Sequence, residues 1–114
     1  MFSICIPTLN EEKYIGGILG CLEKQTFRDF EVIVADGKSS DNTKKEVMKF
    51  SDKLSVTFLE SPKRGVSFQR NYAAKSAKGK YIIFFDADVM IEDDFLQKIN
   101  SYLEKEDIDI LTTW

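Results

Sequence analysis

Residues 80–90 decide the fold, and they read Lys-Tyr-Ile-Ile-Phe-Phe-Asp-Ala-Asp-Val-Met. The apolar run Tyr81–Phe85 does not alternate with polar residues, which predicts a strand buried on both faces of a sheet. Gly79, just before it, is a candidate to end the preceding helix. Asp86 and Asp88 follow the strand's carboxyl end, where open α/β sheets bind their ligands. Paired carboxylates there suit Mg²⁺ or Mn²⁺ shared with phosphate oxygens, and the alternative is a polar turn after a core strand.

Composition indicates one soluble globular domain over residues 1–114, with 43% hydrophobic and 31% charged residues. A net charge of −3 argues against a general nucleic-acid binder, which would carry a basic face. No apolar run could span a bilayer, and the first residues lack the basic start of a signal peptide. Cys5 and Cys21 lack metal-ligand spacing and are expected to be reduced. We therefore predict a cytoplasmic protein, or one that reaches a membrane through a longer parent chain.

Hydrophobic periodicity predicts further strands on both sides of this stretch. They are expected at residues 2–6, where Pro7 ends the strand, and at 30–35, 54–59 and 109–113. The strand at 54–59 is the most alternating, which favours an edge of the sheet. The strand–helix alternation predicts an α/β fold with a mainly parallel, doubly wound sheet and helices on both faces.

Four helices are predicted to connect these strands. The first is expected to be capped by Asn10, and the second to begin with a capping box formed by Thr43 and Glu46. The third, over residues 66–78, places Arg70 on its apolar stripe, where a guanidinium needs an anionic partner or extends to the rim. In the first and fourth helices the expected inward residues are Ile15, Ile18, Leu19, Leu22, Phe95, Ile99, Tyr102 and Leu103. Gly16 and Gly17 are expected to allow close packing of the first helix on the sheet.

Four motifs occur along this pattern, in one order. They read Ile-Pro-Thr-Leu-Asn-Glu at 6–11, Val-Ile-Val-Ala-Asp-Gly-x-Ser-x-Asp-x-Thr at 32–43, Gly-x-Ser-x-Gln-Arg-Asn-Tyr-Ala-Ala at 65–74 and Phe-Phe-Asp-Ala-Asp at 84–88. Each motif is weak alone, but together the set resembles the family 2 glycosyltransferases, inverting enzymes with the Rossmann-like GT-A fold. The resemblance implies a hexosyltransferase-type enzyme that takes its sugar from a UDP- or GDP-linked donor.

The resemblance also implies roles for individual residues. Thr8 and Glu11 would line the base and ribose pocket, and Asp36 would accept an imino N–H of the base, as an acceptor-only carboxylate can. Asp88 would bind Mg²⁺ or Mn²⁺ on the diphosphate, with Asp86 as a ribose or base contact and a second candidate ligand. The full implied nucleotide-sugar-binding set is Pro7, Thr8, Asn10, Glu11, Asp36, Arg70, Asp86, Ala87 and Asp88.

Family members continue beyond the matched motifs into an acceptor-binding region with a catalytic carboxylate base and a Gln-x-x-Arg-Trp-type segment. These features are not found in the 114 residues, so we expect a truncated, donor-binding half of the GT-A domain. The catalytic base and the acceptor are unknown. An uncovered sheet edge would favour self-association.

Two other readings of the Asp-x-Asp motif remain. In haloacid-dehalogenase-type phosphatases the first Asp is the nucleophile, but it usually lies on the first strand and is followed by Thr, whereas here it follows the fourth strand and precedes Val89. A non-catalytic nucleotide-binding module, or a receiver-like module with Asp86 as phospho-acceptor, is the other alternative. The receiver would need an acidic pair near the first strand, which Glu11 and Glu12 match only loosely.

Overall fold

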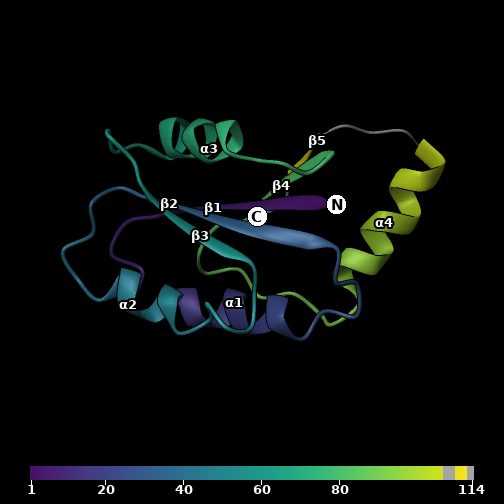
Figure 1. The fold of residues 1–114 in the computed structure, drawn as a ribbon, viewed down its shortest axis with the longest axis horizontal. Coiled ribbons are helices and arrows are strands. Elements are labelled where there is room, and N and C mark those ends of the chain that lie inside the picture. Colours follow the sequence, from purple (N-terminus) through teal and green to yellow (C-terminus); the bar gives the residue numbers. More distant parts are fainter. Residues whose placement is uncertain (107–109, 113–114) are drawn as a thin grey trace.

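Strands and helices alternate throughout the computed structural model, which describes residues 1–106 and 110–112 (Figure 1). The strands are β1 (Phe2–Thr8), β2 (Phe30–Asp36), β3 (Val56–Glu60), β4 (Tyr81–Phe84) and β5 (Ile110–Thr112). The helices are α1 (Ile15–Glu23), α2 (Thr43–Met48), α3 (Val66–Lys75) and α4 (Phe95–Glu106). This order confirms the predicted α/β alternation. The expected end residues of the last strand, Asp109 and Thr113, lie outside the described residues.

The five strands form one sheet in the order β3-β2-β1-β4-β5, and every pairing is parallel. β3 therefore lies at an edge, as its alternating sequence predicts. The chain places β2 and β3 on one side of β1 and β4 and β5 on the other. This reversal makes the carboxyl ends of β1 and β4 the switch point of the sheet, the position where doubly wound folds bind ligands.

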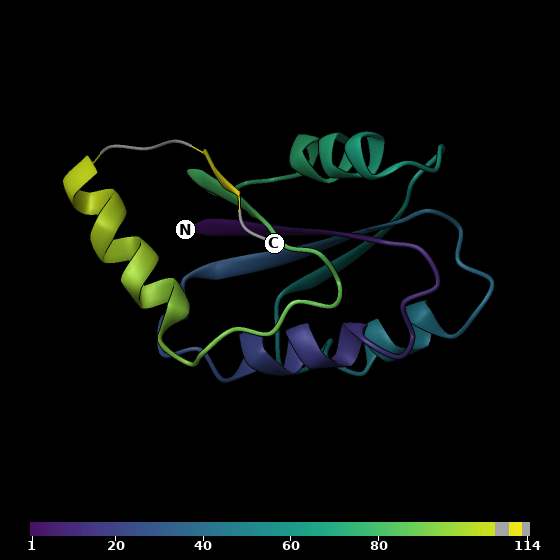
Figure 2. The ribbon, with the colours of Figure 1, turned by 180° about the vertical axis from the view of Figure 1, so that it is seen from behind.

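Helices cover both faces of the sheet, as predicted. α1 and α2 lie on one face and α3 lies on the opposite one (Figures 1 and 2). The larger core contains the buried side chains of α1 and three side chains of α4, namely Leu96, Ile99 and Leu103. The smaller core, under α3, consists of Cys5, Ile33, Ala35 and Ala73. The predicted stripe Ile15, Ile18, Leu19 and Leu22 is fully buried.

Pro7 does not end β1, contrary to the prediction, because its missing N–H costs no ladder hydrogen bond. Cys5 is the last residue of β1 paired with β4, and its carbonyl accepts the N–H of Phe85. Successive residues of a strand point their amides to opposite neighbours, so the nitrogen of Pro7 faces the β4 side after that ladder has ended. On the other side β1 continues to pair with β2 as far as Thr8 and Asp36. This extension carries Thr8 to the switch point.

The predicted helix caps are also wrong. Asn10 adopts a positive φ of 54° and lies in a loop, and α1 starts later, after Tyr14. Thr43 is the first residue of α2 and not its cap, so the box with Glu46 does not form. The side chain of the N-cap residue, Asn42, forms no capping hydrogen bond, and the Asp41 carboxylate accepts the Thr43 N–H at 3.0 Å. Both side chains that were expected to cap helices instead connect two loops, as described below.

The structure departs from the prediction at three further points, two in burial and one at the end of α3. Tyr102 is 50% exposed, and Leu96 takes its place in the core. β4 is fully buried on one face only, because Ile82 and Phe84, on the side of α3, pack against the smaller core but are only partly buried. Gly79 does not cap α3, which ends at Lys75. A Cβ at Gly79 would lie 2.7 Å from the carbonyl oxygen of Met1, so glycine is needed there for close approach to β1.

Among the described residues, no helix is both long enough and apolar enough to cross a membrane.

Candidate functional site

A cavity of about 370 Å³ opens at the switch point, between the carboxyl ends of β1 and β4 and the start of α3. Its lining residues are Pro7, Thr8, Leu9, Glu11, Gly65, Val66, Gln69, Asp86, Ala87 and Asp88. Six of the nine predicted site residues are in this lining. The other three, Asn10, Asp36 and Arg70, lie behind or beside it. The parallel sheet thus brings together loops that are far apart in the sequence.

Asp36 is buried directly beside the cavity. It is only 4% exposed, and its Oδ1 accepts hydrogen bonds from the Thr8 hydroxyl (2.6 Å) and the Ser39 hydroxyl (2.6 Å). Its Oδ2 accepts the Ser39 backbone N–H at 2.8 Å. These donors satisfy part of the carboxylate, which offers about four lone-pair positions. The network holds Thr8 and Asp36 in one orientation at the ends of neighbouring strands.

Arg70 and Asp86 form an ion pair at the opposite wall. The guanidinium Nη2 lies 3.2 Å from Asp86 Oδ1, and the guanidinium carbon lies 5.9 Å from the centre of the Phe84 ring. The sequence left two possibilities for this arginine on an apolar stripe, an anionic partner or extension to the rim, and the structure supplies the partner, Asp86. The pair fixes the first carboxylate of the Asp-x-Asp motif and leaves the exposed Asp88 as the second.

Two loops are tied together next to the cavity, and Asn10 takes part in this contact. Its backbone N–H donates to the Ser39 hydroxyl at 2.8 Å, and its side-chain oxygen accepts the Ser40 N–H at 2.8 Å. The Glu11 N–H donates to the buried Thr43 hydroxyl at 2.9 Å. Asn10 therefore positions the backbone of Glu11 instead of lining the cavity.

Electrostatics single out Glu11. Partial burial raises the pKa of its carboxyl, and the negative charges of Asp88, Asp41 and Asp86 raise it further. Asp41 behaves in the opposite way: although partial burial acts to raise its pKa, hydrogen bonds from Thr43 and from the Glu12 N–H hold it below the usual range. Within the described part of the chain, no three acidic, cysteine or histidine side chains are close enough to form a metal centre by themselves. The raised pKa of Glu11 places its carboxyl among like charges, two of which, Asp86 and Asp88, line the same cavity.

Gln69 lines the cavity and belongs to the motif at 65–74, although its role could not be predicted from that motif. Its side-chain Nε2 donates to the carbonyls of Thr8 (2.8 Å) and Ala35 (2.9 Å), and its Oε1 accepts the Gly65 N–H at 3.0 Å. This buried amide therefore joins the ends of β1 and β2 to the first turn of α3. Its position on the inward stripe, four residues before Ala73, is the sequence signal that could have identified it.

We expect Gln69→Leu to reduce the free energy of unfolding by about 3 kcal/mol, because leucine cannot form the three hydrogen bonds of the amide, each worth about 1 kcal/mol. Urea denaturation monitored by circular dichroism measures this loss. Ser67→Ala, at an exposed position of the same helix, is the control and should change stability by less than about 0.5 kcal/mol. Equal stability of Gln69→Leu and the wild type would contradict the bridging role of the amide.

The model of the family described as Glycosyl transferase family 2 matches residues 3–114. Among curated proteins, a poly(ribitol-phosphate) beta-N-acetylglucosaminyltransferase, TarS of Staphylococcus aureus, is 38% identical over 114 residues, covering 96% of this chain and 20% of its own. A beta-1,3-glucosyltransferase of Escherichia coli, WfgD, is 36% identical over 88 residues, covering 77% of this chain and 35% of its own. The chain thus spans between a fifth and about a third of the length of these relatives.

Solved structures give the same result. The S. aureus TarS fragment 1–349 in complex with UDP superposes with a TM-score of 0.88 at 34% identity, covering 93% of this chain and 32% of that one. The same fragment was also solved with UDP-GlcNAc, with a TM-score of 0.83 at 35% identity. A mannosyltransferase of Pyrobaculum calidifontis, in complex with GDP-Man and Mn²⁺, has a TM-score of 0.83 at 29% identity and covers 90% of this chain and 32% of its own. These matches set aside the phosphatase and receiver-like readings of the Asp-x-Asp motif.

Proposed function

The chain belongs to glycosyltransferase family 2, and from that premise we propose that its cavity binds the nucleotide diphosphate of a sugar donor. The sugar would be a hexose-type unit that the complete enzyme transfers, with inversion, to an acceptor. The observation that carries this proposal is the convergence of Thr8, Glu11 and the Asp86–Asp88 pair at one cavity, with Asp36 hydrogen-bonded to Thr8 directly beside it. One end of that cavity offers buried acceptors and the other offers exposed carboxylates, which suits a ligand with a base at one end and a diphosphate at the other.

The base would lie toward Asp36. A carboxylate can only accept hydrogen bonds when ionised, and its remaining lone-pair positions suit the imino N–H that uracil and guanine share. Thr8 and Ser39 hold the carboxylate in place before any ligand arrives, so little orientation entropy remains to be lost on binding. This contact does not distinguish uracil from guanine, because both bases offer an imino N–H. Relatives were solved with a UDP-linked and with a GDP-linked sugar, so both donors stay candidates.

The diphosphate would lie toward Asp88, together with a divalent cation. Mg²⁺ and Mn²⁺ are commonly held by one or two carboxylates plus substrate phosphates, so a protein-only cage is not required. Asp88 is exposed, Asp86 is held by Arg70, and the crowded negative charge that raises the pKa of Glu11 would be relieved by a cation. The residues present therefore fit such an ion. When bound, it would stabilise the negative charge that develops on the departing nucleoside diphosphate.

We expect Asp36→Ala to weaken binding of the complete nucleoside diphosphate by about 1.5–3 kcal/mol while leaving the affinity for pyrophosphate unchanged. The reason is that Asp36 lies on the base side and contacts Thr8 and Ser39, not the Asp86–Asp88 pair. Calorimetric titration with both ligands in the presence of Mn²⁺ measures the difference. Asp52→Ala, at an exposed position outside the cavity lining, is the control. Equal losses for nucleotide and pyrophosphate would argue against a base contact.

A further inference from the structure

One stretch of this acidic chain carries basic residues and no acidic ones. Residues 61–80 contain six of its 16 basic residues and none of its 19 acidic ones. The basic residues are Lys63, Arg64, Arg70, Lys75, Lys78 and Lys80. Except for Arg70, which pairs with Asp86, all of them are exposed. The segment is α3 with the loops on either side of it, so this part of the chain carries basic charge that no acidic residue within the segment offsets.

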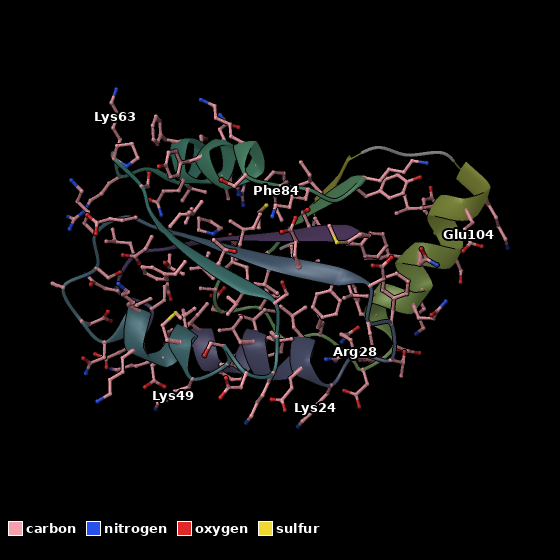
Figure 3. The ribbon with its side chains drawn as sticks, viewed as in Figure 1. Lys24, Arg28, Lys49, Lys63, Phe84 and Glu104 are labelled. Atoms are coloured by element: carbon pink, nitrogen blue, oxygen red, sulfur yellow. The ribbon has the colours of Figure 1, made fainter. Side chains whose placement is uncertain are left out.

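The fold places this segment alone on one face of the molecule. α3 covers its side of the sheet while α1 and α2 cover the other, and no described element lies outside α3 (Figures 1 and 2). In Figure 3, Lys63 projects beyond α3, whereas Lys24 and Lys49 project on the opposite side, below α1 and α2. We call the outward surface formed by Lys63, Phe68, Tyr72, Lys75 and Lys78 the α3 face.

The α3 face also carries apolar and aromatic groups. Phe68 is 37% exposed and stacks on Tyr72 with ring centres 6.3 Å apart, and the Lys63 ammonium lies 5.7 Å from the Phe68 ring centre. Within residues 1–106, Lys63, Lys75 and Lys78 form no ion pair with an acidic side chain. The lysines are therefore available to an external anion, and the aromatic pair offers an apolar surface between them.

We propose that the α3 face docks on a lipid bilayer that contains anionic headgroups. Exposed aromatics among unpaired lysines are the combination that binds the interface of such a bilayer, since the rings enter the headgroup region while the ammonium groups stay at the phosphates. A nucleic-acid duplex would use the same lysines, but its bases are already stacked on one another and leave the aromatic pair without a comparable role, so the bilayer is the favoured partner.

Docking in this way would place the cavity beside the membrane. Val66, the first residue of α3, lines the cavity and is 54% exposed, and Phe68 belongs to the same first turn of the helix. A bilayer in contact with Phe68 would then lie next to the cavity mouth. The chemical class of acceptor that fits this arrangement is a sugar or polyol carried on a membrane lipid, since its hydroxyl would be presented at the surface where the donor binds. This last step rests on the proposed function, whereas the docking itself does not.

The test is sedimentation of residues 1–114 with vesicles, without nucleotide. We expect binding to phosphatidylcholine vesicles that contain phosphatidylglycerol, and none to phosphatidylcholine alone. At roughly fivefold per basic residue, Lys75→Glu/Lys78→Glu should lower the partition coefficient by at least about 25-fold. Phe68→Ala should lower it roughly fivefold through lost apolar insertion. The matched control, Lys24→Glu/Lys45→Glu, makes the same charge change on the opposite face and should keep near-wild-type binding.

Three outcomes would overturn the proposal. They are no binding to the anionic vesicles at low salt, equal losses in the two double variants, and tighter binding to a DNA duplex than to vesicles at the same phosphate concentration. Circular dichroism of each variant confirms folding. Because no nucleotide is present, failure here leaves the donor-binding proposal intact, and failure of nucleotide binding leaves this one intact.

Discussion

Asp88→Asn is expected to bind a nucleoside diphosphate no more tightly with Mn²⁺ than without it. The amide loses the charge of an exposed carboxylate at the end of β4, where the proposal places the cation. Asp86 cannot replace it fully, because that carboxylate already pairs with Arg70 at 3.2 Å. We expect the Mn²⁺-dependent part of the affinity, about 2–3 kcal/mol, to disappear while the fold and thermal stability stay unchanged. Titration calorimetry with and without Mn²⁺ measures this part directly.

The matched control for this variant is Asp93→Asn. Asp93 is another exposed aspartate, five residues later, and lies outside the cavity lining. The Asp93→Asn variant loses the same charge away from the proposed cation position, so it should retain the Mn²⁺ effect. An unchanged Mn²⁺ effect in Asp88→Asn would refute the assignment of this carboxylate to the metal.

A polypeptide of residues 1–114 is expected to bind donor yet transfer sugar at least about 10⁴-fold below the typical enzyme turnover of about 10 s⁻¹. The chain has no histidine, and the cavity carboxylates are all given donor-side roles. An inverting displacement needs a base within hydrogen-bond reach of the acceptor hydroxyl and a pocket that orients it. The aligned regions cover only 20% and 35% of the two relatives, which leaves room for both.

The measurement is sugar transfer by the purified polypeptide, with Mn²⁺ and panels of UDP- and GDP-linked donors and of acceptors. Slow hydrolysis of donor by water is compatible with the expectation. Asp88→Asn serves as the control for contaminating enzymes. Rapid transfer that disappears in this variant would mean that a complete active site lies within these residues.

The arrangement of the elements could be predicted from the sequence because apolar spacing alone decides it. Ile15, Ile18, Leu19 and Leu22 recur with helical spacing and are all fully buried. The positions of Thr8, Glu11, Asp86 and Asp88 around one cavity followed from parallel strands, whose carboxyl ends meet at one edge. Local order and one topological rule were therefore enough to predict that these side chains meet at one cavity.

The predictions that were wrong or missing concern residues whose contacts lie far away in the sequence. Pro7 continues β1 because the pairing with β4 ends at Cys5, so no β4 carbonyl lacks a hydrogen bond from position 7. The residues around Pro7 do not reveal where β4 ends. Asn10 has the composition of a helix cap, but its hydrogen bonds go to Ser39 and Ser40, about thirty residues away. Gln69 was missed for the same reason, since its partners lie on two other strands. Long-range polar contacts override local signals at such positions.

The central claim is that the switch-point cavity binds a nucleoside diphosphate with a divalent cation. Calorimetric titration of residues 1–114 with UDP, GDP, ADP and CDP, each with Mn²⁺ and again with EDTA, tests it most directly. We predict one-to-one binding of UDP or GDP with a Kd of about 1–100 μM in Mn²⁺, weakened at least about tenfold by EDTA. If none of the four binds more tightly than about 1 mM in Mn²⁺, the claim is contradicted.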